Sequence, residues 1–201
     1  MTALGAVVLA GGLARRMGGT DKGLVALGGK PMIAHVLEAI APAVDALVIV
    51  ANRNTGDYAA LGAPFGASVV ADRHAGHLGP LAGLAAGIRA LGTERTMLCP
   101  CDSPFVTASL VERLDAVCRE GDVDIAVARD GTRLQPVFCV ARREVLDSLE
   151  AFLDGGQRKI DAWYAGESVR EVDCRDLAAA FRNVNTEEER ALAESMLERR
   201  P

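Results

Sequence analysis

Short runs of apolar and β-branched residues alternate along this chain with stretches in which apolar residues recur every three or four positions. Runs of the first kind predict buried β-strands, and the periodic stretches predict helices with one buried face. The predicted strands are residues 3–10, 46–51, 67–71, 96–99, 125–128, 136–140 and 169–172. Strands separated by helices are typical of an α/β fold, so we expect a doubly wound, mostly parallel sheet with helices on both faces.

Capping residues mark where several of these helices begin. Pro31 stands at a favoured first helical position, and further helical patterns follow Thr107 and Arg142. Thr186 and Glu189 have the spacing of a capping box, which predicts a last helix.

The chain has no low-complexity linker and no internal repeat, and we predict a single domain over residues 1–201. The nearest feature to a boundary is residues 129–133, where Asp130 and Gly131 predict a turn between adjacent strands.

Composition and charge narrow the classes of protein that remain. The formal net charge of −5 argues against a broad nucleic-acid-binding surface. No apolar run approaches the roughly 20 residues that a membrane-spanning helix needs. The five scattered cysteines fit a reducing compartment better than a disulfide framework. We therefore expect a cytoplasmic protein that binds neither nucleic acid nor membranes.

A glycine-rich segment, LAGGLARRMGGTDK over residues 9–22, follows the first predicted strand. Backbone N–H groups left open by glycines, flanked by fixed cations, form a cradle for a polyphosphate. The glycine spacing differs from the dinucleotide-binding fingerprint, which argues against a dinucleotide-dependent oxidoreductase. The Gly29-Lys30 pair runs into Pro31 rather than Ser or Thr, which argues against a P-loop switch protein.

Polar residues and glycines follow several predicted strands directly. Gly11-Gly12, Asn52, Asp72 and Asp102 each stand just beyond a strand end. Because the carboxyl ends of parallel strands meet at one edge of a sheet, we expect these residues to share a ligand site there.

Taken together, these motifs resemble one family. The pattern LAGGxxxRMGxDK, matched here with one extra glycine, resembles the sugar-nucleotide-type nucleotidyltransferases and, within them, the molybdenum cofactor guanylyltransferases or MobA family. Later matches occur in the expected order, at GPLAG (residues 79–83), CPCDSP (99–104) and NVNT (183–186). The resemblance implies an Mg²⁺-dependent enzyme that transfers GMP from GTP to molybdopterin and releases pyrophosphate. It also implies a nucleotide half over roughly residues 1–106 and an acceptor half over roughly 107–201.

The resemblance assigns roles to particular positions. Lys22 and Arg16 would stabilise the departing pyrophosphate, and Asp102 would hold Mg²⁺. The nucleotide-binding residues implied are Leu9, Ala10, Gly11, Gly12, Lys22, Asn52, Asp72, Gly83 and Asp102. The family pattern also implies transient contact with cofactor-biosynthesis proteins or with the molybdoenzymes that accept the product.

The acceptor-binding residues implied are Arg158, Lys159, Asn183 and Asn185. The two basic residues follow two glycines and could anchor the phosphate of molybdopterin. The two asparagines lie on one face if the segment is extended, and could hold the pterin or the phosphates.

Plainer interpretations stay open at these positions. Lys22 could be a solvated surface lysine, and Arg158-Lys159 a solvated charge pair. Asp102 could cap the helix near Thr107, Asp72 could be a turn aspartate, and the Asn185-Thr186 segment could cap the last helix.

Alternatives also stay open for the nucleotide base and for the acceptor substrate. Relatives that use CTP tend to carry LAAG where this chain has LAGG, which favours GTP. Val50 departs from a family position that contacts the nucleotide through Asn, and Asn52 could serve instead. A molybdopterin cytidylyltransferase, or a nucleotidyltransferase for another phosphorylated acceptor, is the alternative function.

Overall fold

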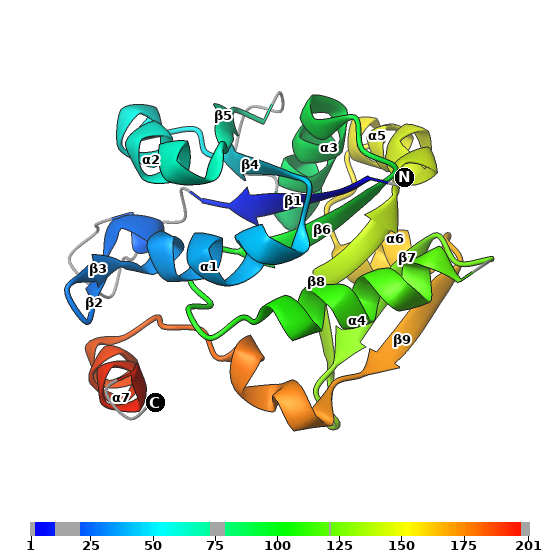
Figure 1. Ribbon diagram of the computed structural model, residues 1–201. Helices are drawn as coiled ribbons and strands as arrows, with labels where there is room; N and C mark the ends of the chain where they lie inside the picture. The colour runs from blue at the N-terminus through cyan, green and yellow to red at the C-terminus, as the bar shows by residue number, and fades with distance from the viewer. Residues whose placement is uncertain (1–2, 11–20, 73–78, 121, 198–201) are drawn as a thin grey trace.

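A computed structural model describes residues 3–10, 21–72, 79–120 and 122–197 of the chain. Its main feature is a seven-stranded sheet in the order β5-β4-β1-β6-β8-β7-β9 (Figure 1). The strands are β1 (Leu4–Leu9), β4 (Ala46–Val50), β5 (Ser68–Val70), β6 (Arg95–Pro100), β7 (Ile125–Arg129), β8 (Leu134–Arg142) and β9 (Val169–Asp173). Each matches a strand predicted from the apolar runs.

The sheet is parallel except at one strand. β1 pairs in parallel with β4 and β6, β4 pairs in parallel with β5, and β7 with β9. β8 runs antiparallel to both β6 and β7. The predicted turn explains this reversal: the Asp130 N–H donates to the carbonyl of Arg133 at 3.1 Å, and Gly131 has a φ of 98°. Because so short a connection joins only antiparallel strands, the fold is mostly rather than wholly parallel, as predicted.

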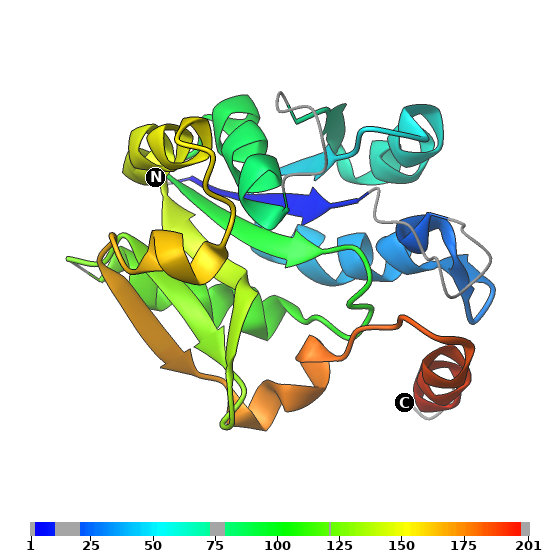
Figure 2. The same cartoon turned by 180° about the vertical axis from the view of Figure 1, so that it is seen from behind.

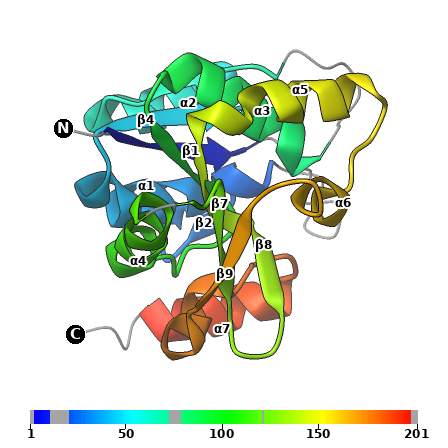
Figure 3. The same ribbon diagram turned by 90° about the vertical axis from the view of Figure 1, so that its right-hand side faces the viewer.

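Helices cover both faces of the sheet (Figures 1 and 3). One apolar core lies between the sheet and helices α1 (Met32–Ile40), α2 (Thr55–Gly62) and α4 (Ala108–Arg119). A second core lies between the other face and α3 (Pro80–Leu91), α5 (Leu146–Asp154) and α6 (Ile160–Tyr164). Short 3₁₀ helices connect these elements: η1 (Lys22–Leu24), η2 (Ala41–Ala43), η3 (Ala63–Phe65), η4 (Arg143–Val145) and η5 (Arg175–Phe181).

Helix α3 approaches the central strand unusually closely because it presents glycines to it. A Cβ added at Gly83 would lie 2.3 Å from Cδ2 of Leu9, and one at Gly87 would lie 2.0 Å from Cγ2 of Val7. At Gly87 three atoms of Val7 within 3.0 Å leave no room for a side chain, so this glycine sets the distance between helix and sheet. At Gly83 only the end of the Leu9 side chain would have to move.

The last helix, α7 (Glu187–Leu197), packs away from the main cores (Figure 2). It lies beside a two-stranded ribbon, β2 (Ala26–Leu27) with β3 (Lys30–Pro31), that was not predicted. The small core beneath consists of Val25, Leu27, Met32, Phe105, Val184 and Ala193. The segment before α7 therefore returns from the far side of the sheet to the N-terminal part of the chain.

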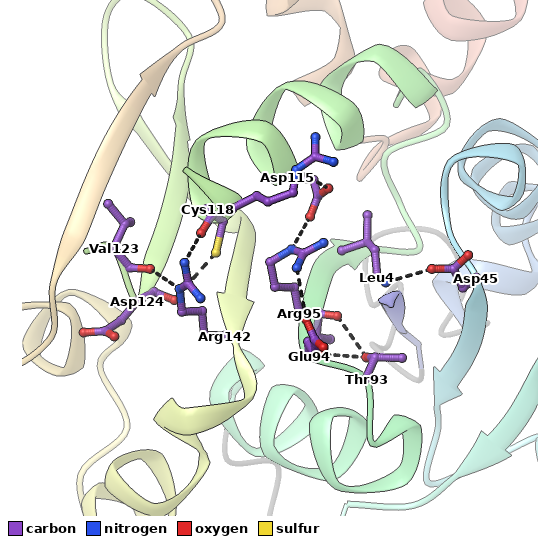
Figure 4. Close-up of polar contacts among 12 residues, drawn as sticks. Leu4, Asp45, Thr93, Glu94, Arg95, Asp115, Cys118, Val123, Asp124 and Arg142 are labelled. Atoms are coloured by element: carbon purple, nitrogen blue, oxygen red, sulfur yellow. Dashed lines mark hydrogen bonds and ion pairs between the residues drawn. The ribbon is translucent and has the colours of Figure 1, made fainter. Parts of the chain in front are cut away.

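Buried polar contacts fix the amino-terminal edge of β6 (Figure 4). The Arg95 Nε donates to Oδ1 of Asp115 in α4 at 2.6 Å, and both residues are buried. Burial alone would lower the pKa of Arg95, but the hydrogen bond and charge of Asp115 outweigh it and raise that pKa. Arg142, at the end of β8, donates to the carbonyls of Val123 and Cys118 at 2.7 Å each. These contacts fix the end of the sheet where β6 begins. The polar residues predicted to share a ligand site lie at the opposite end, where the parallel strands finish.

Among the helices that the structure describes, none is both long enough and apolar enough to span a bilayer.

Candidate functional site

Three side chains from distant parts of the chain meet at the carboxyl edge of the sheet. The Lys22 Nζ, in η1, donates to Oδ2 of Asp102 at 3.0 Å and also donates to Oδ1 of Asn185. Asp102 stands two residues beyond β6, and Asn185 stands two residues before α7. The side chains of Lys22 and Asp102 keep 23% and 12% of their exposure, so a ligand can reach both. We call these three residues the charged cluster.

The loop that carries Asp102 is held by the segment before α7. The Val184 N–H donates to the backbone carbonyl of Asp102 at 3.0 Å, and the Ser103 hydroxyl donates to Oδ1 of Asn183 at 2.6 Å. Figure 2 shows the segment before α7 running past this loop. Asn183 thus contacts the Asp102 loop directly.

The helix-cap interpretation of Asp102 is wrong. Helix α4 is capped instead by Thr107, whose side chain accepts from the Leu110 N–H at 3.3 Å. The Asp102 carboxylate faces Lys22, which leaves it in place for a metal or a substrate.

The predicted capping box at α7 is confirmed. The Glu189 N–H donates to Oγ1 of Thr186 at 3.1 Å, and the Glu189 carboxylate accepts from the N–H groups of Thr186 and Asn185 at 3.2 and 2.6 Å. Capping therefore uses the backbone of Asn185, and its side chain is directed to Lys22 instead.

A second polar pair lies where β4 and β5 end. The Asn52 Nδ2 donates to Oδ2 of Asp72 at 2.9 Å, and the Asp72 N–H donates to Oδ1 of Asn52 at 3.1 Å. These reciprocal bonds join two strand ends, which a plain turn aspartate would not do. The remaining Asp72 oxygen, Oδ1, is buried and accepts no hydrogen bond from the described residues. Val50 is a buried core residue, so of the two positions only Asn52 is placed to reach a ligand.

The other residues predicted to bind the nucleotide lie near the carboxyl edge of the sheet or outside the residues that the structure describes. Leu9 ends β1, and the Ala10 N–H donates to the carbonyl of Val50 at 2.9 Å. Gly83 lies inside α3 and packs against Leu9. Gly11, Gly12 and Arg16 lie outside the described residues.

The predicted basic anchor, Arg158 and Lys159, directly precedes α6. The Arg158 Nη1 donates to two backbone carbonyls of its own neighbourhood, Leu153 at 2.6 Å and Gln157 at 2.5 Å. Lys159 precedes the first residue of α6. Within residues 3–10, 21–72, 79–120 and 122–197, no hydrogen bond or ion pair joins either residue to the charged cluster.

A cavity of about 440 Å³ adjoins the charged cluster and lies between the β7–β8 turn, η5 and α7. Asn183 and Asn185 line it together with Gln135, and its apolar walls come from Phe105, Phe181, Ala193 and Met196. Asp130 lies at the turn, where N–H groups of Arg133 and Thr132 hold the pKa of its carboxyl well below the usual range. The cavity therefore combines apolar surfaces with amide groups and with charged side chains of both signs, since Arg133, Arg182 and Glu189 also line it.

Sequence reasoning missed a buried group next to Lys22. Asp21, only 4% exposed, accepts a hydrogen bond from the Tyr58 hydroxyl on Oδ1 and another from Asn54 Nδ2 on Oδ2 at 3.3 Å. Asp21 belongs to the glycine-rich motif, which could have drawn attention to it. No pattern in the sequence marks Tyr58, whose helix was not placed.

The cysteines near the site are buried thiols. Burial, and then the charge of Asp102, raise the pKa of both Cys99 and Cys101. Both stay protonated at neutral pH, so neither acts as a thiolate nucleophile. Among the described residues no group of three or more His, Cys, Asp or Glu side chains could enclose a metal.

Comparisons with known proteins match the chain over most of its length. Residues 6–170 match the family model described as the MobA-like NTP transferase domain. A molybdenum cofactor guanylyltransferase from Shewanella sediminis is 46% identical over 185 residues, covering 92% of each chain. One from Shewanella woodyi is 46% identical over 192 residues, covering 95% of this chain and 96% of the relative.

A solved structure is similar in three dimensions. The molybdopterin-guanine dinucleotide biosynthesis protein A from Archaeoglobus fulgidus superposes with a TM-score of 0.82 at 26% identity. The match covers 98% of this chain and 100% of that one.

Proposed function

The chain belongs to the MobA-like NTP transferase family, and from that premise we propose that it transfers GMP from GTP to molybdopterin and releases pyrophosphate. It is a nucleotidyltransferase, as its relatives are. The observation that carries the proposal is the charged cluster, in which a lysine, a carboxylate and an amide oxygen converge at the carboxyl edge of the sheet.

The donor set at this edge fits Mg²⁺. Asp102 offers a partly exposed carboxylate, and Asn185 offers an amide oxygen close by. Mg²⁺ prefers such hard oxygen ligands, and in nucleotide sites it takes only one or two from the protein, the rest coming from phosphates and water. When bound, the ion would offset phosphate charge at Asp102.

Lys22 would bind the phosphates that leave. Its ammonium has three N–H donors, and Asp102 and Asn185 accept from it in the absence of substrate. A departing pyrophosphate gains negative charge, which a fixed ammonium stabilises more in the transition state than in the bound substrate. We propose the same role for Arg16.

The reaction needs no general base from the protein. A phosphate oxygen of molybdopterin, already ionised near neutral pH, would attack the α-phosphorus of GTP. The bond from that phosphorus to the bridging oxygen would break, and pyrophosphate would leave with the electron pair. The chain's own residues would orient the two phosphates and stabilise charge.

We propose that the two substrates lie on either side of the charged cluster. On the nucleotide side, Asn52, Asp72, Leu9 and Ala10 lie at the ends of β1, β4 and β5, where the guanosine would bind. Gly83 would contribute indirectly, because it packs against Leu9.

On the acceptor side, Asn183 and Asn185 line the cavity that would hold the pterin. Arg158 and Lys159 stay a separate prediction for the acceptor phosphate. The enzyme would act in the cytoplasm and would meet cofactor-biosynthesis proteins or molybdoenzymes only transiently.

The test mixes the protein with Mg²⁺, molybdopterin and each nucleoside triphosphate in turn, and measures pyrophosphate together with the dinucleotide product. We expect both products from GTP alone, and neither when Mg²⁺ is replaced by EDTA. Faster reaction with CTP would overturn the choice of guanine and indicate a cytidylyltransferase. Pyrophosphate release only with another phosphorylated acceptor would overturn molybdopterin as the substrate.

A further inference from the structure

The segment that carries Lys22 is attached to the rest of the molecule through a buried carboxylate. Asp21 precedes Lys22 directly, and its two oxygens accept from different side chains, Oδ1 from the Tyr58 hydroxyl and Oδ2 from Asn54 Nδ2 at 3.3 Å. A buried carboxylate needs such donors to offset its lost hydration. These bonds tie the start of η1 to the β4–α2 unit.

Both donors are themselves fixed. Tyr58, a residue of α2, has its side chain fully buried in the first apolar core. Asn54 adopts a left-handed backbone with a φ of 52°, rare for a residue other than glycine. That strained conformation sits at the start of α2, where it directs the side chain to Asp21.

The next residue after Lys22 fits between the same anchor and the Asp102 loop. A Cβ added at Gly23 would lie 2.7 Å from the Tyr58 hydroxyl oxygen and 3.2 Å from Sγ of Cys101. Cys101 immediately precedes Asp102. Tyr58 therefore touches the segment that carries Lys22 on one side, and the Asp102 loop borders that segment on the other.

From this arrangement we infer that Tyr58 is a positioning residue for Lys22. Its hydroxyl holds Asp21 in the interior, so that Lys22 projects to Asp102 and Asn185 and does not pair with the carboxylate next to it. Without the hydroxyl, Asp21 loses a donor and can turn toward the neighbouring ammonium, where it competes with the phosphates. The inference rests on the proposed function, since it concerns the same lysine.

The first experiment compares two variants that each lose one buried hydroxyl. The chain has two tyrosines, and the other, Tyr164, donates to the carbonyl of Pro136 at 2.7 Å in the second core. We expect Tyr58→Phe to lower kcat for GMP transfer by about tenfold to a hundredfold, the size of one lost charged hydrogen bond, with KM for GTP changed by less than about threefold. Tyr164→Phe should lose similar thermal stability and keep kcat. Equal kcat in the two variants would overturn the inference.

A double-mutant cycle separates positioning from general loosening. If Tyr58 acts through Lys22, Tyr58→Phe should change the residual kcat of Lys22→Ala by less than about twofold. Full additivity of the two losses would overturn the inference. Should Tyr58→Phe fail to fold, Asn54→Gly takes its place, because glycine keeps the left-handed backbone and removes only the donor.

Hydrogen exchange tests the anchor without any substrate. The N–H groups of Leu24 and Val25 donate to the carbonyls of Asp21 and Lys22 at 3.0 and 3.2 Å. We expect faster exchange at both amides in Tyr58→Phe and wild-type rates in Tyr164→Phe; unchanged exchange in Tyr58→Phe would overturn the anchor. If the wild-type protein does not transfer GMP, the proposed function fails, and this measurement still decides whether Tyr58 holds the segment.

Discussion

Replacing Asp102 by Asn removes one negative charge from the charged cluster and keeps the shape of the side chain. The ion pair that it breaks joins Lys22 Nζ and Asp102 Oδ2 at 3.0 Å. The Asn183 side chain and the Val184 N–H, which hold this loop, contact Ser103 and the backbone of Asp102, so the substitution leaves those contacts intact.

The substitution should lower the free energy of unfolding much less than it raises the barrier to GMP transfer. Since the pair is partly buried, with side-chain exposures of 23% and 12%, its loss should lower the free energy of unfolding by about 1 kcal/mol. Loss of a charge contact in the transition state should lower turnover by about 10²–10³, or about 2.7–4 kcal/mol. A metal-binding role adds that the variant should need more Mg²⁺ for half-maximal activity.

The assay is pyrophosphate release with GTP and molybdopterin across an Mg²⁺ titration, with thermal unfolding measured on the same samples. Asp176→Asn is the matched control. It breaks a surface ion pair in which Arg113 Nη1 lies 2.6 Å from Oδ1 of Asp176, a residue of η5. The control should keep wild-type turnover. Turnover of Asp102→Asn within threefold of wild type, at the same Mg²⁺ requirement, would refute the reasoning.

Three further predictions concern the scaffold. Gly87→Ala should lower the free energy of unfolding by about 1–3 kcal/mol in urea denaturation, because its Cβ would lie 2.0 Å from a buried valine of β1. Gly56→Ala, with no atom within 4 Å, should leave it unchanged or raise it by up to about 1 kcal/mol, and equal losses in both would contradict this packing argument. Asp115→Ala removes the nearer carboxylate from the buried Arg95 guanidinium, which keeps Glu94 at 3.6 Å, and should cost about 1.5–3 kcal/mol; a loss below about 1 kcal/mol would contradict this contribution. Burial raises the pKa of Cys118 from 9.0 to about 11 in the folded state, so its contribution to stability is complete below pH 9 and is lost as the pH rises toward 11. Unfolding at pH 8 to 11 should show this fall, and Cys118→Ala should reduce its slope.

The strands could be predicted because each is a compact apolar run, and their positions agree with the structure. Helix α3 was not among the predicted helices, although Leu81, Leu84, Ile88 and Leu91 recur in it at helical spacing. It is buried on most of its surface, and its glycines, unfavourable in an isolated helix, are explained only by contact with β1. Tertiary packing therefore explains the small residues of this helix, which local sequence alone does not.

The sequence also predicted some residues of the candidate site better than others. Lys22 and Asp102 were expected in one crevice because the motif and the strand ends place them at one edge, and the structure brings them within hydrogen-bond distance. The Arg158 side chain was expected at the acceptor because of its charge, yet it turns back to backbone carbonyls. Sequence gives the type and order of such residues, whereas the direction of a long side chain depends on neighbours that only the fold supplies.

Asn185 lies 163 positions after the lysine that it contacts. A nascent chain emerging from the ribosome thus exposes Lys22 and Asp102 well before Asn185, which contacts that lysine. Long-range closures of this kind form late and slowly. Stop codons or proteolytic cuts ahead of α7 should therefore yield polypeptides that retain most of the sheet and lack a completed catalytic centre.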